Sequence, residues 1–123
     1  MSKAMKIIHV DTNKYALSEM QKVIPQILPN AELHSFQSPK PALAFAEAQG
    51  CDVLLTEVEF WSDQFGGIEL AKAIQKLNPQ VNIILVTVWN EYELSRELSG
   101  LQISGLISKP WKVEKLANVF KTY

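Results

Sequence analysis

The sequence has very little cysteine: Cys51 is the only one in 123 residues. One cysteine cannot form an internal disulfide or supply the several thiolates of a zinc cluster, and this usage suits a reducing compartment. No apolar run approaches the roughly 18 residues that a membrane-spanning helix requires, and the first residues lack the apolar core of a signal peptide. We therefore expect a cytoplasmic protein with no membrane segment.

The sequence also lacks an excess of charge of either sign. Its 12 lysines and arginines and its 13 aspartates and glutamates leave a formal net charge of −1. Such a chain has no general attraction for nucleic acid or an anionic membrane, so we expect no direct nucleic-acid binding. The length and the 47% hydrophobic share predict one domain over residues 1–123, with residues 1–4 as a short leader if Met5 is the natural start.

What the sequence does contain is a hydrophobic period that changes repeatedly between strand-like and helix-like. Short apolar or alternating runs typical of strands lie at residues 6–10, 31–36, 53–56, 81–86 and 105–108. Apolar residues at helical spacing lie at residues 14–28, 39–48, 68–77, 90–101 and 113–120. Ser38-Pro39 and the Asn90–Glu93 pair are signals for a helix start, whereas Pro25 is expected to kink or shorten the first helix.

This order of five strands alternating with five helices predicts an α/β fold. Alternation at these lengths favours parallel βαβ units with right-handed crossovers. The result would be a five-stranded parallel sheet with helices on both faces, a doubly wound (βα)5 arrangement. Sites in such folds lie beyond the carboxyl ends of the strands, where the strand order reverses. The residues that follow each strand are therefore the candidates for a site.

Polar residues follow four of these strands. Asp11 and Thr12 follow the first, Glu57 the third, Thr87 the fourth and Lys109-Pro110 the fifth. Carboxylates, hydroxyls and a lysine would then meet at one rim. No glycine-rich phosphate loop follows the first strand, and the chain has no Ser-His-Asp order and no His-x-x-x-His pair. Neither a dinucleotide-binding fold nor a catalytic centre is indicated, and we expect no enzyme activity.

The stretches IIHVDTN, DVLLTEVEF followed by FGGIELAKAI, NIILVTVWNEY and SGLISKPW occur in this order over nearly the whole chain. Together they resemble the receiver domain of bacterial two-component response regulators, the CheY-like domain of phosphorelay signal transduction, which has a flavodoxin-like fold. The segments GIELAKAIQKLNP and EYEL look most like receivers of regulators that carry a LytTR-type DNA-binding domain. Each motif alone is weak, but four of them at strand ends form a specific signal.

The resemblance implies roles for the residues at the strand ends. In the family an aspartate after the third strand takes a phosphoryl group from a phosphohistidine, and a magnesium ion held by acids after the first strand screens the charge. A threonine or serine after the fourth strand and a lysine after the fifth bind phosphoryl oxygens, and Thr87 and Lys109 match these two. Asp11 matches the first acid of the pair, and the bond before Pro110 is expected to be cis.

Three positions depart from the family pattern. Glu57 replaces the phosphate-accepting aspartate, and its carboxylate lies one methylene further out, where an error near 1 Å costs roughly 100-fold in rate. Thr12 replaces the second acid, which is the direct metal ligand, and a hydroxyl is a poor magnesium ligand beside a carboxylate. Leu106 stands where a tyrosine or phenylalanine often acts as the switch residue. We expect no cofactor, and magnesium would have only Asp11 and Glu57 as carboxylate ligands.

The first two departures fit together physically, because fewer acids at the rim leave less repulsion for a metal ion to relieve. The longer Glu57 can then reach towards Lys109 and Thr87 without metal. We expect a charge-assisted contact between Glu57 and Lys109 that partly stands in for the phosphoryl group.

Other residues have competing interpretations. Asp11 is either part of the site or a cap on the first helix. His9 is expected to be a satisfied core histidine and Glu59 a solvated loop residue. Trp89 is an equal candidate for function and for packing, and Trp61 for packing or for an exposed patch.

These features favour an atypical receiver, or pseudo-receiver, that acts as a protein-interaction or dimerisation module without phosphorylation. Its partner would be a histidine kinase, an output domain or a second copy of the chain, and the expected contact surface covers residues 90–101, 106–108 and 113–123. The alternative is a receiver that keeps slow, magnesium-dependent phosphoacceptor activity and regulates transcription through a separate output domain. An unrelated flavodoxin-like enzyme or cofactor binder is a third hypothesis.

Overall fold

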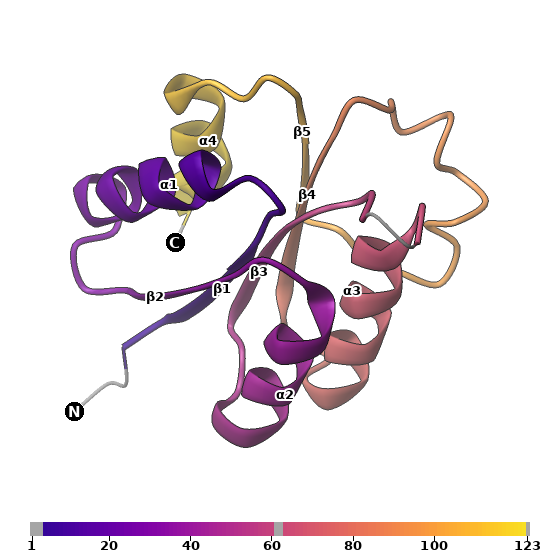
Figure 1. Ribbon diagram of the computed structural model, residues 1–123, viewed down its shortest axis with the longest axis horizontal. Coiled ribbons are helices and arrows are strands. Elements are labelled where there is room, and N and C mark those ends of the chain that lie inside the picture. Colours follow the sequence, from indigo (N-terminus) through magenta and orange to yellow (C-terminus); the bar gives the residue numbers. More distant parts are fainter. Residues whose placement is uncertain (1–3, 61–62, 123) are drawn as a thin grey trace.

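The computed structural model describes residues 4–60 and 63–122, in which strands and helices alternate along the chain. The strands form one sheet in the order β2-β1-β3-β4-β5, and every neighbouring pair is parallel. Their bounds are β1 (Lys6–Val10), β2 (Glu32–Phe36), β3 (Val53–Glu57), β4 (Asn82–Thr87) and β5 (Gly105–Ser108). The prediction of a five-stranded parallel sheet is confirmed (Figure 1).

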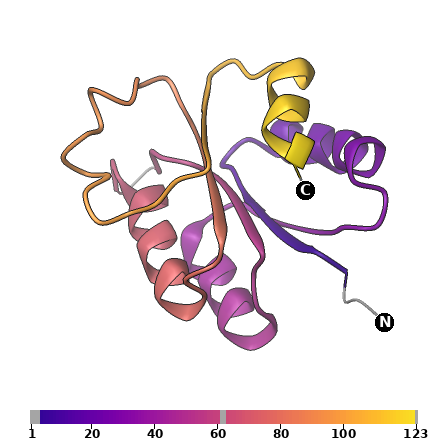
Figure 2. The same cartoon turned by 180° about the vertical axis from the view of Figure 1, so that it is seen from behind.

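Helices cover both faces of this sheet, as Figures 1 and 2 show from opposite sides. Helix α1 (Lys14–Ile27) and helix α4 (Val113–Val119), which continues into the 3-10 turn η1 (Phe120–Thr122), lie on one face. Helix α2 (Pro39–Gln49) and helix α3 (Gly66–Leu77) lie on the other. The fold is therefore doubly wound, and its strand order reverses between β1 and β3, where such folds place their sites.

The central strands are buried on both faces, as their continuous apolar runs predict. Alternate side chains point to opposite faces, so that Ile8 and Leu54 pack towards α2 and α3 while Ile7 and Leu55 pack towards α1 and α4. This alternation also determines the face on which Glu57 lies. β3 ends on Glu57, two residues beyond Leu55, so both side chains point to the same face of the sheet.

The helix predicted for residues 90–101 does not form. The capping pair is present, since the Asn90 N–H donates to Glu93 Oε1 and the Glu93 N–H donates to Asn90 Oδ1, both at 2.8 Å. The residues that follow form successive turns, whose backbone hydrogen bonds mix spacings of three and four residues. Only Leu94 and Leu101 of this stretch are buried. A short helix depends on tertiary packing of one face, and two buried side chains supply little.

The connection between β4 and β5, residues 88–104, is called the 88–104 segment below; it crosses the α3 side of the sheet (Figure 1). Ser38 is the N-cap residue of α2, as expected, although its side chain makes no capping hydrogen bond. Pro25 lies in the last turn of α1, which ends two residues later. The leader expected at residues 1–4 falls mostly outside the described residues, as do Trp61 and Tyr123.

Candidate functional site

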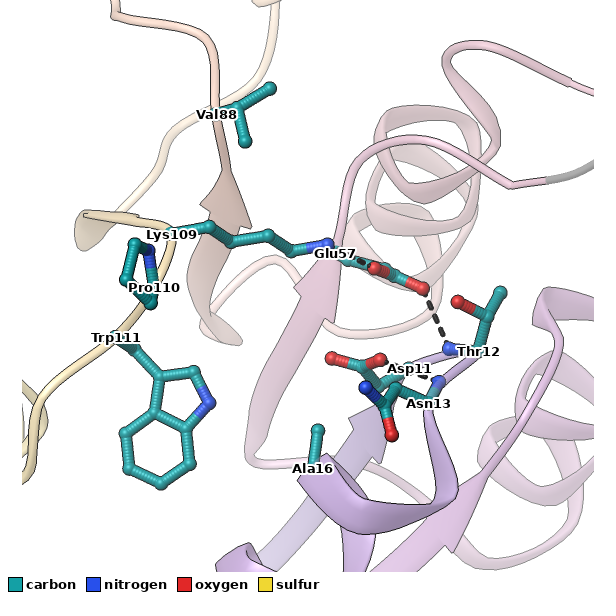
Figure 3. Close-up of a pocket in the computed structure, with 9 residues that line it drawn as sticks. All are labelled: Asp11, Thr12, Asn13, Ala16, Glu57, Val88, Lys109, Pro110 and Trp111. Atoms are coloured by element: carbon teal, nitrogen blue, oxygen red, sulfur yellow. Dashed lines mark hydrogen bonds and ion pairs between the residues drawn. The ribbon is translucent and has the colours of Figure 1, made fainter.

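The carboxyl ends of the strands bring the predicted site residues to one rim. An open cavity of about 470 Å³ lies there, lined by Asp11, Thr12, Asn13, Ala16, Glu57, Val88, Lys109, Pro110 and Trp111 (Figure 3). Asp11 and Thr12 follow β1, Glu57 ends β3, and Lys109-Pro110 follows β5, as the sequence predicts. Thr87 ends β4 beside them but does not line the cavity.

The Glu57 carboxylate, at the end of β3, links a residue that follows β1 to a residue that follows β5. Its Oε1 accepts a hydrogen bond from the Thr12 N–H at 2.6 Å, and its Oε2 accepts one from the Lys109 ammonium. The residue is only 3% exposed, so this ion pair is largely withdrawn from water on the carboxylate side. The expected contact between Glu57 and Lys109 is present, and Figure 3 shows the lysine extended across the rim to reach it.

The charge of Lys109 is stabilised by three acids. Partial burial by itself lowers the pKa of the lysine, but the hydrogen bond and charge of Glu57, together with the charges of Asp11 and Glu59, outweigh it and raise the pKa overall. Lys109 is therefore an ammonium throughout the neutral range. The Lys109-Pro110 peptide bond is cis, as expected from the family resemblance.

Asp11 is held by the turn that follows β1. Its Oδ1 accepts the Asn13 N–H at 2.8 Å, and Asn13 in turn caps α1 by accepting the Tyr15 N–H at 2.8 Å. The alternative of Asp11 as the helix cap is therefore wrong. Burial raises the pKa of Asp11, the Asn13 hydrogen bond opposes this, and the nearby charge of Glu57 adds to the increase.

Asp11 and Glu57 are the two carboxylates at the cavity that could hold a magnesium ion. Magnesium requires near-octahedral oxygen ligands. Each Glu57 oxygen already accepts one hydrogen bond, from the Lys109 ammonium or from the Thr12 N–H, so an ion would have to share these oxygens, and Thr12 offers no carboxylate of its own. Within residues 4–60 and 63–122, no three side chains of the histidine, cysteine and acidic types gather closely enough to hold a metal.

Thr87 meets a different acid from the one expected. Its hydroxyl donates to Glu59 Oε1 at 2.8 Å, so the expected reach of Glu57 to Thr87 is wrong, and so is the expectation that Glu59 is merely solvated. The Thr87 oxygen also accepts the Trp89 N–H at 3.1 Å. Glu59 was interpreted as solvated because it lies two residues beyond β3, in a connection whose path is not determined by a periodic pattern.

Two further residues lie beneath or beside the rim. His9 is 2% exposed on β1, and its Nδ1 has no hydrogen-bond partner among the described residues, so it is a core histidine but not a fully satisfied one. Burial lowers the pKa of His9 to about 4, although the charge of Glu57 opposes the shift. Leu106, at the switch position, packs as a partly buried side chain into the cluster on the α3 face.

Gly67 allows α3 to begin against the end of β3. Its N–H donates to the Val58 carbonyl at 2.9 Å. A Cβ at this position would lie 1.9 Å from the Glu57 carbonyl oxygen, far inside any real contact. The close approach of α3 to the strand that ends on Glu57 therefore requires glycine.

The order of strands and the positions of the polar residues at this rim are those of a known protein family. A family model of the response regulator receiver domain matches residues 7–121. The chain belongs to this family. The hypothesis of an unrelated flavodoxin-like enzyme is therefore wrong, whereas no comparison addresses the expected likeness to LytTR-type regulators.

Three similar proteins share 25% or less of their aligned residues with this chain. The chain is 25% identical over 114 residues to the cyclic di-GMP phosphodiesterase response regulator RpfG of Xanthomonas campestris, covering 91% of this chain but only 30% of that protein. Its fold is similar to that of a receiver domain protein from Methanospirillum hungatei, with a TM-score of 0.83, 22% identity and coverage of 98% and 93% of the two chains. Vibrio cholerae CheY4 matches with a TM-score of 0.82 and 20% identity, over 98% of both chains.

Receiver domains in general interact with kinases and output domains. None of the helices in the described ranges 4–60 and 63–122 is both long enough and apolar enough to span a membrane.

Proposed function

We propose that this chain is a pseudo-receiver: a receiver domain of two-component phosphorelay signalling that engages a protein partner without being phosphorylated, and that is not an enzyme. The observation that carries the proposal is the state of Glu57, whose two carboxylate oxygens are bonded by Thr12 and Lys109. Phosphoryl transfer requires an oxygen placed in line with the phosphoryl group, and these two bonds fix the direction of the Glu57 carboxylate. Here the lysine that would bind phosphoryl oxygens is already paired with a carboxylate.

The partner would be a histidine kinase, an output domain or a second copy of the chain, in the cytoplasm. The surface that we assign to it comprises residues 90–101 in the 88–104 segment, residues 106–108 of β5 and residues 113–122 of α4 and η1. Tyr92, 88% exposed, and Val113, 48% exposed, supply apolar area on this surface.

Phosphorylation is tested directly by incubating the protein with acetyl phosphate and magnesium and measuring its intact mass. In a transfer, a carboxylate oxygen would bond to phosphorus, the bond from phosphorus to the acetate oxygen would break, and acetate would leave. We expect no added phosphoryl group on the natural protein. The double variant Glu57→Asp with Thr12→Asp should gain one, whereas Thr12→Asp alone should not. A stable phosphoryl group on Glu57 of the natural protein would contradict the proposal.

The competing function is slow, magnesium-dependent phosphate acceptance by Glu57, with regulation of transcription through a separate output domain. One observation favours it: Glu57 lines the open cavity together with Asp11 and Lys109, so a small donor can approach the carboxylate. The same mass measurement separates the two functions, because this one requires phosphate on Glu57 and its loss in Glu57→Gln.

A self-association partner is tested by analytical ultracentrifugation over a range of protein concentrations. If a second copy is the partner, the protein should sediment as a dimer and Tyr92→Glu should return it to a monomer. The exposed Tyr15, which lies on α1 outside the assigned surface and is 83% exposed, supplies the matched control Tyr15→Glu. A dimer that Tyr92→Glu leaves intact would place the contact elsewhere.

A further inference from the structure

A closed set of contacts joins the connection after β3 to the start of the 88–104 segment. The Thr87 hydroxyl donates to Glu59 Oε1 at 2.8 Å, and the Trp89 N–H donates to the Thr87 oxygen at 3.1 Å. The Trp89 ring then meets the Phe65 ring edge to face, with centroids 5.7 Å apart and an interplanar angle of 82°. Glu59 and Phe65 both belong to the connection between β3 and α3. This connection therefore contacts Thr87 through Glu59 and Trp89 through Phe65.

The chemistry of Thr87 explains why an acid is needed in this set. Thr87 is fully buried, and a buried hydroxyl without an acceptor destabilises the folded state. Its single hydrogen can point in only one direction, and pointing it at the Glu59 carboxylate leaves a lone pair for the Trp89 N–H. A carboxylate acceptor also makes the bond stronger than a neutral one would be. The position of the Trp89 backbone is thus linked to Glu59 through one hydroxyl.

We propose that Glu59 is a positioning residue that holds Thr87 and, through it, fixes Trp89 and the start of the 88–104 segment. This inference rests on the proposed function, because it concerns the surface assigned to the partner. Glu57 holds Lys109 and Glu59 holds Thr87, so the acid that ends β3 and the acid two residues beyond it bind both side chains that would otherwise bind a phosphoryl group. Trp89, the residue immediately before the partner surface, is then held in place before a partner arrives, which lowers the entropy cost of binding.

The test uses amide hydrogen exchange and aromatic NOE measurements by NMR on the full chain. Glu59→Ala should speed exchange of the Trp89 N–H by roughly fivefold to tenfold, the factor that one net hydrogen bond corresponds to, and should weaken the NOE between Phe65 and Trp89. Glu59→Gln keeps an oxygen acceptor and should stay within about threefold of the natural protein. The control Glu69→Gln removes an exposed acid in the first turn of α3 and should change neither measurement.

A second pair of variants tests the same link from the hydroxyl side, in case Glu59→Ala does not fold. Thr87→Val removes the hydroxyl at nearly constant volume and should reproduce the faster exchange of the Trp89 N–H, while Thr87→Ser should keep it slow. Unchanged exchange in Glu59→Ala, or equal exchange in Thr87→Val and Thr87→Ser, would overturn the role of Glu59. Neither result touches the phosphorylation test, so the failure of this inference and the failure of the proposed function are told apart.

Discussion

The rim around Glu57 and the 88–104 segment lie at neighbouring strand ends but are held in different ways. At the rim, regular strands place the Glu57 carboxylate between the Thr12 N–H and the Lys109 ammonium, and the residue is 3% exposed. In the 88–104 segment the backbone hydrogen bonds mix spacings of three and four residues. Beyond Trp89, the buried side chains of this segment are Leu94 and Leu101. Regular strands place the rim side chains without help from any local sequence motif. A capping pair is a local motif, and it does not produce a helix when the following residues have no buried face.

The largest effect should come from breaking the ion pair at the rim. Lys109→Met leaves the Glu57 carboxylate buried without its cation and should lower the free energy of unfolding by about 4 kcal/mol. Glu57→Gln should cost only about 1 kcal/mol, because its oxygen still accepts the Thr12 N–H and the partly exposed lysine can turn to water. Urea unfolding at pH 7 measures both. Equal losses of unfolding free energy in the two variants would mean that leaving the Glu57 charge buried and unpaired carries no extra cost.

The approach of α3 to the rim should be nearly as sensitive. Gly67→Ala places a Cβ against the Glu57 carbonyl and should cost about 3 kcal/mol, since backbone atoms on both sides must move. The neighbouring Gly66→Ala is the matched control, because its Cβ would lie 3.3 Å from the Phe60 ring, a side chain that can shift. Urea unfolding of the two variants gives the difference. Similar costs would show that the strand and the helix separate easily at this point.

Most of the fold could be predicted from the sequence because buried strands and amphipathic helices leave periodic patterns. The positions of Asp11, Glu57 and Lys109 follow from those patterns, since carboxyl ends of parallel strands meet at one rim. The pairing of Thr87 with Glu59 could not be predicted, because Glu59 lies in an aperiodic connection. The helix expected from Asn90 was wrong because its capping pair is a local signal, and the packing that decides helix formation is not local.

Acid should weaken the protein through the histidine beneath the rim. The pKa of His9 falls from 6.5 to about 4 on folding, so between these values the unfolded chain binds the proton and the folded chain does not. Stability from this group is complete above pH 6.5 and is lost as the pH falls. Between pH 7 and pH 5 the loss should be about 2 kcal/mol.

The variant His9→Leu isolates this contribution from that of the carboxylates. Its unfolding free energy should change less between pH 7 and pH 5 than that of the natural protein, by about the same 2 kcal/mol. His34→Gln, which changes the only other histidine, is measured alongside as the control for losing an imidazole. A natural pH dependence in His9→Leu would mean that other groups cause the acid loss.

The smallest effect should be in the 88–104 segment, and it sharpens the contrast most directly. Asn13 and Asn90 each accept a backbone N–H at 2.8 Å, but Asn13 begins α1 whereas Asn90 begins a run of turns. Asn13→Ala should cost about 1 kcal/mol of unfolding free energy, the usual effect of losing a helix cap. Asn90→Ala should cost only about 0.3 kcal/mol, because a segment with few buried contacts opens locally without unfolding the core. Its effect should instead appear as faster hydrogen exchange of the Glu93 N–H. Equal costs for the two variants would mean that the segment is coupled to the core as tightly as a packed helix, and the difference drawn between it and the rim would not hold.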